Sequence, residues 1–245
     1  MKNIKSRTIL FSVSFLLLSF FLAVKVVPKV DFSRDSETTT ASNINLSGRS
    51  PQTSQRLKQT SNDLDELYRQ AAQAQPALSA VTQKAADHFG GEALIPKTLK
   101  ARERSLEKIA ADYGGDASRI TDIARSSVIF ETESQVLQAL DMLQDDMNVI
   151  RIKNRFQSPV NGYRDVLLNI LMPNGHIVEM QLHLRSILEV KYKFGDNIYQ
   201  EIRSIEADAE QEQRDLTPSE AKRIQELSSE AKRLYDRAFE QSKTL

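Results

Sequence analysis

The feature that most constrains the fold is a pair of apolar runs around Asn174-Gly175. Residues 163–172 (YRDVLLNILM) and 176–184 (HIVEMQLHL) have strand length and are rich in aliphatic side chains. Asn-Gly between two such runs favours a two-residue β-hairpin loop, because a type I′ turn needs positive φ at both central positions. The predicted register has these opposite pairs: Met172 and Ile177, Ile170 and Glu179, Leu168 and Gln181.

Glu179 is the unexpected residue of this hairpin. The predicted register places it with Gln181 and His183 on one face, and the aliphatic side chains of that face are Val166, Leu168 and Ile170. The opposite face is the predicted core, with Val178, Met180, Leu182, Leu184, Leu167 and Leu171. An unpaired carboxylate among aliphatic side chains is costly, so Glu179 needs a cation, a metal ion or a raised pKa. A solvated sheet face is the alternative explanation.

The amino-acid composition of the chain excludes several kinds of site. The chain has 245 residues, in which 33 basic residues balance 33 acidic ones, so a basic site must be a local cluster. There is no cysteine, which excludes thiol catalysis and thiolate metal sites. The three histidines, His88, His176 and His183, do not have the spacing of zinc ligands. A metal ion is therefore expected to be held by oxygen atoms.

The N-terminal segment indicates export or membrane attachment. Lys2, Lys5 and Arg7 precede an apolar run over residues 9–24, whose length lies between those of a signal peptide and a membrane span and so does not decide between them. The positive charge before the run favours an exported body. We therefore divide the chain into a signal peptide or anchor over residues 1–30, a disordered linker over 31–54, and a folded domain over 55–245.

The folded domain is predicted to be α+β, with a small mixed or antiparallel sheet flanked by helices. Helical periodicity occurs in residues 54–73, 79–89, 99–113 and 133–144, again from Arg185 to Glu206, and in a last helix that opens at Thr217. The strand-like runs lie in mid-chain, at 126–131, 148–156 and in the hairpin. Thr217-Pro218 is typical of a helix N-terminus.

Charged residues near the hairpin suit phosphoryl transfer. Lys100, Arg104 and Lys108 recur every four residues and form one cationic stripe, as a polyphosphate requires, although a solvated helix face explains it as well. Asp122 precedes a strand and can share a hard cation with Glu179. Alternation puts further cations on one face of a neighbouring strand: Arg151, Lys153 and Arg155. An exposed tyrosine, Tyr163, follows Asn161-Gly162.

These segments resemble the RelA/SpoT-type alarmone synthetase domain, which transfers pyrophosphate from ATP to the 3′-hydroxyl of GDP or GTP. The similarity rests on LKARERSLEKI, ITDIARSSVIF, NGYR and VEMQL, in that order, between about residues 97 and 205. The resemblance implies that Asp122 and Glu179 are catalytic and bind Mg²⁺, and that Tyr163 stacks on guanine. It implies ATP contacts by Lys100, Arg102, Arg104 and Lys108, and acceptor contacts by Asn161, Tyr163, Arg164, Lys153, Arg155 and Gln181.

The chain departs from the family pattern on the acceptor side. Many synthetases have Tyr-x-Ser-Leu-His after the tyrosine, whereas this chain has Leu167 at the histidine position. A lysine that often precedes the tyrosine is replaced by Pro159-Val160, and Gly195-Asp196 stands where related small proteins have Gly-His. These departures affect the predicted contacts with GTP as acceptor more than the predicted contacts with ATP as donor.

Three functions are therefore compared. The first is a Mg²⁺-dependent pyrophosphokinase that makes a (p)ppGpp-type alarmone from ATP and GDP or GTP. The second is an exported toxin or effector that modifies another acceptor, such as the 3′ end of tRNA, and the third is a catalytically silent nucleotide-binding module. An exported or inner-membrane-anchored protein meets ATP only in a cytoplasm, and we favour an effector that acts in the cytoplasm of a target cell. The sequence does not fix the oligomeric state.

Overall fold

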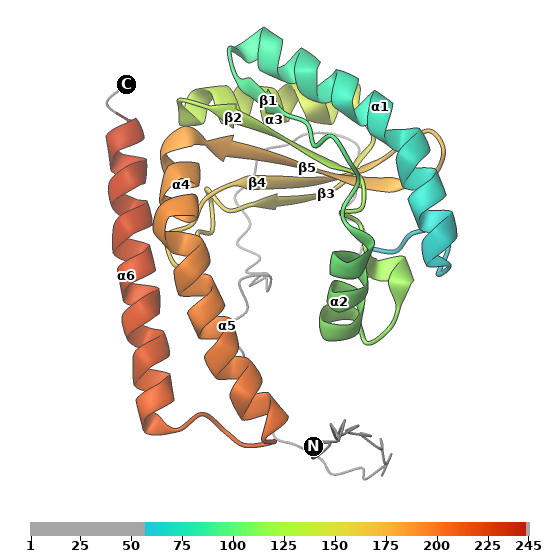
Figure 1. Ribbon diagram of the computed structural model, residues 1–245. Coiled ribbons are helices and arrows are strands. Elements are labelled where there is room, and N and C mark those ends of the chain that lie inside the picture. Colours follow the sequence, from blue (N-terminus) through green and yellow to red (C-terminus); the bar gives the residue numbers. More distant parts are fainter. Residues whose placement is uncertain (1–56, 244–245) are drawn as a thin grey trace, which may run out of the picture. The chain divides into compact units, whose positions relative to one another are not determined.

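A computed structural model describes residues 57–243 of the chain, and these contain a mixed five-stranded sheet flanked by helices (Figure 1). The strand order is β1-β2-β5-β4-β3, with β2 and β5 parallel and the other neighbours antiparallel. The strands are β1 Glu92–Leu94, β2 Arg125–Phe130, β3 Val149–Asn154, β4 Val166–Leu171 and β5 Ile177–Leu184. The α+β prediction is confirmed.

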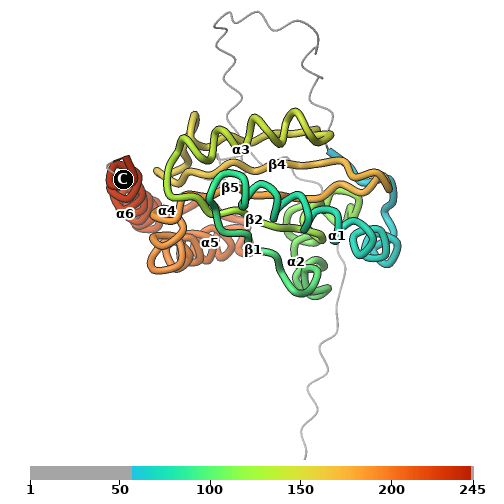
Figure 2. Tube along the Cα trace, turned by 90° about the horizontal axis from the view of Figure 1, so that it is seen from above, coloured from blue at the N-terminus to red at the C-terminus, as the bar shows by residue number. Residues whose placement is uncertain are grey.

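Helices pack on one face of this sheet and flank the other. They are α1 Leu64–Phe89, α2 Arg102–Tyr113, α3 Glu133–Asp146, α4 Arg185–Val190, α5 Asp196–Gln211 and α6 Pro218–Ser242. A 3₁₀ turn occupies Ala117–Arg119, and a π-helical segment, Lys191–Gly195, joins α4 to α5. Figures 1 and 2 show α1 and α3 on one face, with α2 and the antiparallel pair α5–α6 toward the other.

Two helix predictions have different outcomes. α6 begins as predicted, because Thr217 forms a capping box with Glu220 and Pro218 occupies the first turn. The two predicted helical runs at 54–73 and 79–89 are instead one helix, α1, which starts after the N-cap Asp63 and continues through Pro76. An interior proline costs a helix about 3 kcal/mol. Buried side chains on both sides of Pro76, including Leu67 and Leu78, hold α1 on the sheet and oppose that cost.

The hairpin forms, but its predicted loop and register are wrong by one residue. The loop has three residues, in which the Gly175 amide donates to the Met172 carbonyl at 2.8 Å and the Met172 amide donates to the His176 carbonyl at 2.9 Å. Pro173 fixes a negative φ, which suits a type I turn and excludes type I′, and Gly175 then takes a φ of 80°. β4 and β5 therefore pair Leu171 with Ile177 and place Asn169, not Ile170, opposite Glu179.

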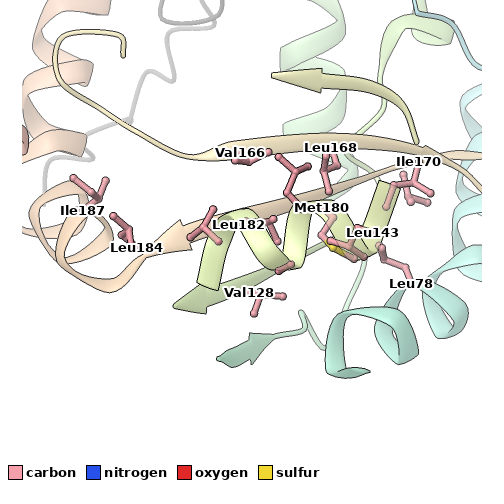
Figure 3. Close-up of a cluster of buried hydrophobic side chains, with 14 of the residues drawn as sticks. Leu78, Val128, Leu143, Val166, Leu168, Ile170, Met180, Leu182, Leu184 and Ile187 are labelled. Carbon is pink, nitrogen blue, oxygen red and sulfur yellow. The ribbon is translucent and has the colours of Figure 1, made fainter. Parts of the chain in front are cut away.

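The core lies between the sheet and helices α1 and α3 (Figure 3). The β5 side chains Val178, Met180 and Leu182 face it, as the alternation predicts. The corrected register adds the following β4 side chains to the core face: Val166, Leu168 and Ile170. Leu167 and Leu171, predicted for the core, belong to the other face, since a one-residue slip exchanges the two faces of a strand.

The predictions for the N-terminal segment lie outside the described residues. This applies to the signal peptide or anchor over residues 1–30, to its apolar run at 9–24 and to the linker at 31–54. Within residues 57–243, every helix is too short or too polar to span a bilayer.

His176 generates a prediction about acid stability. Its side chain is fully buried, and neither ring nitrogen has a hydrogen-bond partner among the described residues. Burial lowers the pKa of His176 to about 4, whereas an unfolded histidine titrates near ~6.5. The unfolded state therefore binds more protons between these values, so His176 contributes stability that is present above pH 6.5 and lost as the pH falls toward 4.

We expect His176→Leu to weaken this pH dependence, because leucine fills the site without titrating. One titrating group accounts for a slope of at most about 1.4 kcal/mol per pH unit. Urea unfolding at several pH values between 4.5 and 7.5 measures the free energy of unfolding of both proteins. Parallel curves for wild type and His176→Leu over this range would contradict the assignment.

Candidate active site on the open face of the sheet

Glu179 lies on the face of the sheet opposite α1 and α3. The register places one polar residue from each of four strands in a single row, in the order Arg125 (β2), Glu179 (β5), Asn169 (β4) and Arg151 (β3). The next row contains Ser127, Gln181, Leu167 and Lys153. Glu179 thus has polar neighbours on its own face, and the predicted aliphatic neighbours Val166, Leu168 and Ile170 lie on the opposite face.

Asp122 is the second carboxylate of the site. It lies three residues before β2, and its side chain is 9% exposed. The Lys100 and Lys108 ammonium groups both donate to Oδ2, at 2.6 Å and 2.9 Å. Oδ1 is buried and has no hydrogen-bond partner among the described residues. Asp122 therefore has one oxygen held by two cations and one oxygen left for a further ligand.

The two carboxylates have opposite pKa shifts. Burial disfavours the charge on Asp122, but Lys108 and Lys100 outweigh this effect and hold the pKa of Asp122 below its ordinary value. Burial, together with the nearby charge of Asp122, raises the pKa of Glu179. Such a pair combines a permanent anion with a carboxylate of enhanced basicity, which is the combination that a metal-assisted general base needs.

The predicted cationic stripe is divided in the structure. Lys100 precedes α2 and reaches Asp122 together with Lys108. Arg104 pairs with Glu107 on the same helix at 2.8 Å, and Arg102 pairs with Asp65 of α1 at 2.6 Å. Arg102 and Arg104 are thus engaged by exposed carboxylates, whereas the two lysines hold the buried one.

A pocket of about 510 Å³ adjoins these lysines. Its cationic lining residues are Lys100, Arg104 and Lys108 from the α2 region, Arg125 from β2 and Arg203 from α5. Tyr199, one turn before Arg203, lies beside them. Sequence reasoning missed Arg125, Tyr199 and Arg203. The i,i+4 spacing of Tyr199 and Arg203 is a signal of a shared helix face, but nothing in the sequence brings α5 to α2.

Tyr163 is partly buried, not exposed as the sequence predicts. Its ring packs edge-on against Tyr235 of α6 with centroids 5.4 Å apart, and its hydroxyl donates to Asp165 Oδ2 at 3.1 Å. The preceding turn needs positive φ at Asn161 and Gly162, and a Cβ on Gly162 would lie 2.9 Å from the Lys232 carbonyl of α6. The Asn-Gly-Tyr motif therefore docks this loop closely on α6.

The other residues predicted for the acceptor side separate into two groups. Arg155 pairs with buried Asp165 at 2.6 Å, and Arg164 binds Asp236 at 2.9 Å and covers the Phe239 ring, so both guanidinium groups make contacts inside the domain. Lys153 and Gln181 belong to the row next to Glu179, and Gln181 Nε2 donates to Glu179 Oε1 at 2.7 Å. Asn169, beside Glu179, was missed because the predicted register was wrong.

The carboxylates fit a hard divalent cation. Residues 57–243 contain no cluster of three His, Asp or Glu side chains suited to a metal. Mg²⁺ does not need one, because it commonly binds through one or two carboxylates together with substrate phosphates. The unpaired Oδ1 of Asp122 and the neighbouring Glu179 supply such a pair.

Comparison with known proteins supports the family resemblance. No family model matches the chain. A curated relative, the (p)ppApp synthetase toxin Tas1 of Pseudomonas aeruginosa, is 40% identical over 68 residues, which are 27% of this chain and 15% of the relative. The match thus spans well under two thirds of that relative.

Solved structures extend the likeness over most of the chain. The type VI effector Tas1, in complex with its immunity protein, has a TM-score of 0.54 and 21% identity over 72% of this chain and 96% of that one. Small alarmone synthetase 2 from Bacillus subtilis has a TM-score of 0.49 and 19% identity over 74% and 94%. The resemblance that the sequence motifs indicate is confirmed, and the chain has the fold of the RelA/SpoT-type alarmone synthetases.

Proposed function

We propose that the chain is a pyrophosphokinase that takes pyrophosphate from ATP. The observation that carries this proposal is the meeting of Asp122 and Glu179 with Lys100 and Lys108 beside the cationic pocket. A polyphosphate needs several cations within reach, and the pocket lining offers them from three separate elements. The similarity to the (p)ppApp synthetase Tas1 supports the same reaction class.

The chain's own residues then divide the chemistry between them. The triphosphate binds in the pocket, where lysine and arginine side chains offset its charge. We assign the proton acceptor to Glu179: as the acceptor's 3′-oxygen bonds to the β-phosphorus of ATP, its proton passes to this carboxylate. The bond between the β-phosphorus and the oxygen that bridges to the α-phosphorus breaks, and AMP leaves. Asp122 and Glu179 would hold Mg²⁺, which would supply charge neutralisation at the transferred phosphates.

For the acceptor we propose a purine nucleotide, with adenosine nucleotides ahead of GDP and GTP. The curated relative is named as a synthetase of (p)ppApp, which favours adenosine. We assign the base contact to Tyr163, as the family resemblance implies, and Lys153 and Arg151 lie on the same sheet face as Glu179, where they would meet the 5′-phosphates. The loss of the usual histidine at Leu167 agrees with an altered acceptor.

The direct test follows ³²P from γ-labelled ATP into separate reactions with AMP, ADP, ATP, GDP, GTP and tRNA. Labelled product with an adenosine nucleotide supports the proposal in full. Transfer to guanosine nucleotides or to tRNA alone would overturn the acceptor assignment. Absence of transfer to all of them would favour a silent nucleotide-binding module.

Delivery outside the producing cell is a further part of the proposal. ATP is a cytoplasmic substrate, and the similar protein Tas1 is described as a type VI effector. We propose that the domain is exported and acts in the cytoplasm of a target cell.

We predict that Glu179→Gln lowers turnover at least ~100-fold, the usual loss on removal of a general base. Its melting temperature should stay level or rise, because the substitution removes a carboxylate charge that burial and the nearby Asp122 disfavour, as the raised pKa of Glu179 indicates. Initial rates and melting curves are measured on one preparation. Glu240→Gln, an exposed carboxylate on α6, is the matched control and should behave as wild type. A destabilised but fully active Glu179→Gln protein would refute the catalytic role.

The contact of both lysines with Asp122 leads to a prediction about the order of binding. While Lys100 and Lys108 donate to Asp122, each has fewer donors free for the phosphates of ATP, and their charges repel a cation that approaches Oδ1. We therefore expect the metal to bind weakly to the free protein and tightly together with the triphosphate. Lys100→Met should raise the affinity for Mn²⁺ alone roughly tenfold or more, yet lower ATP affinity about 10- to 100-fold.

Electron paramagnetic resonance of free Mn²⁺ and calorimetry with a non-hydrolysable ATP analogue measure the two affinities separately. Lys84→Met, which removes an exposed lysine of α1 far from the site, is the matched control. A purely structural pair between Lys100 and Asp122 would leave both affinities unchanged and lower only the melting temperature.

The position of Tyr163 leads to a prediction about the acceptor base. Tyr163→Leu should raise KM for the acceptor by one to two orders of magnitude, since a stacked base contributes ~1–3 kcal/mol. KM for ATP should not change. Tyr163→Phe keeps the ring and should keep the acceptor KM within a few-fold, although it loses the bond to Asp165. Equal acceptor KM values for the leucine and phenylalanine variants would rule out stacking on this ring.

A further inference from the structure

A line of hydrogen bonds runs along β5 from the predicted catalytic carboxylate into the protein. Glu179, Gln181 and His183 alternate on one face of the strand. Gln181 Nε2 donates to Glu179 Oε1 at 2.7 Å, and Gln181 Oε1 lies 3.0 Å from His183 Nε2. His183 is 3% exposed, so the inner end of this line is buried.

The chemistry of the three groups fixes the direction of each bond. An ionised carboxylate only accepts hydrogen bonds, so the NH₂ group of Gln181 faces Glu179 and the side-chain carbonyl oxygen of Gln181 faces His183. His183 must then donate from Nε2, which makes it the neutral tautomer with a bare Nδ1. Burial lowers the pKa of His183 to about 4, in agreement with a neutral ring. Nδ1 has no hydrogen-bond partner within residues 57–243.

The inner end of this line of hydrogen bonds lies near Asp165, which binds the tyrosine predicted to stack on the acceptor base. The register of β4 and β5, continued by one residue, brings Asp165 opposite His183. Asp165 in turn binds Arg155 at 2.6 Å and the Tyr163 hydroxyl at 3.1 Å. His183 is therefore held between a buried ion pair and the site, where its ring has little freedom to turn.

We infer that Gln181 and His183 are positioning residues, which fix the Glu179 carboxylate toward the acceptor hydroxyl and do not themselves contact the acceptor. A bond to Oε1 restricts the side-chain rotamer of Glu179 and so aims Oε2 at one place. Misplacement of a reacting group lowers turnover even when the group itself is intact, because a shift of about 1 Å costs on the order of 100-fold in rate. This inference rests on the proposed function and replaces the predicted acceptor contact of Gln181.

Steady-state kinetics distinguish the two roles of Gln181. Gln181→Leu should lower kcat about 10- to 100-fold and leave KM for both substrates within about twofold. His183→Leu should act in the same direction, and His183→Gln, whose amide can still donate, should recover most of the loss. Gln138→Leu, exposed on α3, is the control. A raised acceptor KM with normal kcat in Gln181→Leu would overturn the positioning role and restore the acceptor contact.

A second measurement does not depend on activity. The ¹⁵N resonances of the histidine rings report the tautomer directly, and the chain has only three histidines to assign. We expect His183 in the free wild-type protein to carry its proton on Nε2, and this preference to weaken in Gln181→Leu. A proton on Nδ1 in wild type would refute the hydrogen-bond line whether or not the protein transfers pyrophosphate. Failure of every transfer assay with the Nε2 tautomer present would instead refute the proposed function alone.

Discussion

The charge of Asp122 is the constraint around which the site is arranged. A carboxylate that is 9% exposed cannot remain ionised without close cations, and Lys100 and Lys108 supply them through one of its oxygens. The second oxygen stays without a partner among the described residues, and burial together with the same negative charge raises the pKa of Glu179. A single buried anion thus binds Lys100 and Lys108 in the free protein, has one oxygen without a partner for a further ligand, and contributes to the basicity of its neighbour.

Local features of the fold were predicted from the sequence better than the pairing of its strands. The alternation of β5 was predicted correctly because the period of a strand is a local property. Its pairing with β4 was not, because Pro173 converts a two-residue loop into a three-residue one and moves Asn169 opposite Glu179. β1 has only three residues and no apolar alternation, and α1 continues through Pro76 because packing on the sheet overrides the local signal.

The candidate site was likewise predicted where local sequence features define it and missed where tertiary packing does. Asp122 and Glu179 were recognised as a pair from their residue types and family motifs, and the structure brings them within electrostatic range. Arg125 and Arg203 reach the same pocket from β2 and α5, a meeting that depends on tertiary packing and leaves no periodic signal. The buried pair of Arg155 and Asp165 also lies beyond sequence reasoning, since a basic residue on a strand face looks the same whether it faces a ligand or a buried acid.

On the proposed function, Asp122 exchanges its two lysines for a metal ion when a nucleoside triphosphate binds. A crystal structure with a non-hydrolysable ATP analogue and Mn²⁺, located by its anomalous scattering, tests this claim most directly. We expect Mn²⁺ on Asp122 Oδ1 and Glu179, with the Lys100 and Lys108 ammonium groups moved to phosphate oxygens. Lysines that remain on Asp122, with the triphosphate and metal bound elsewhere, would contradict it.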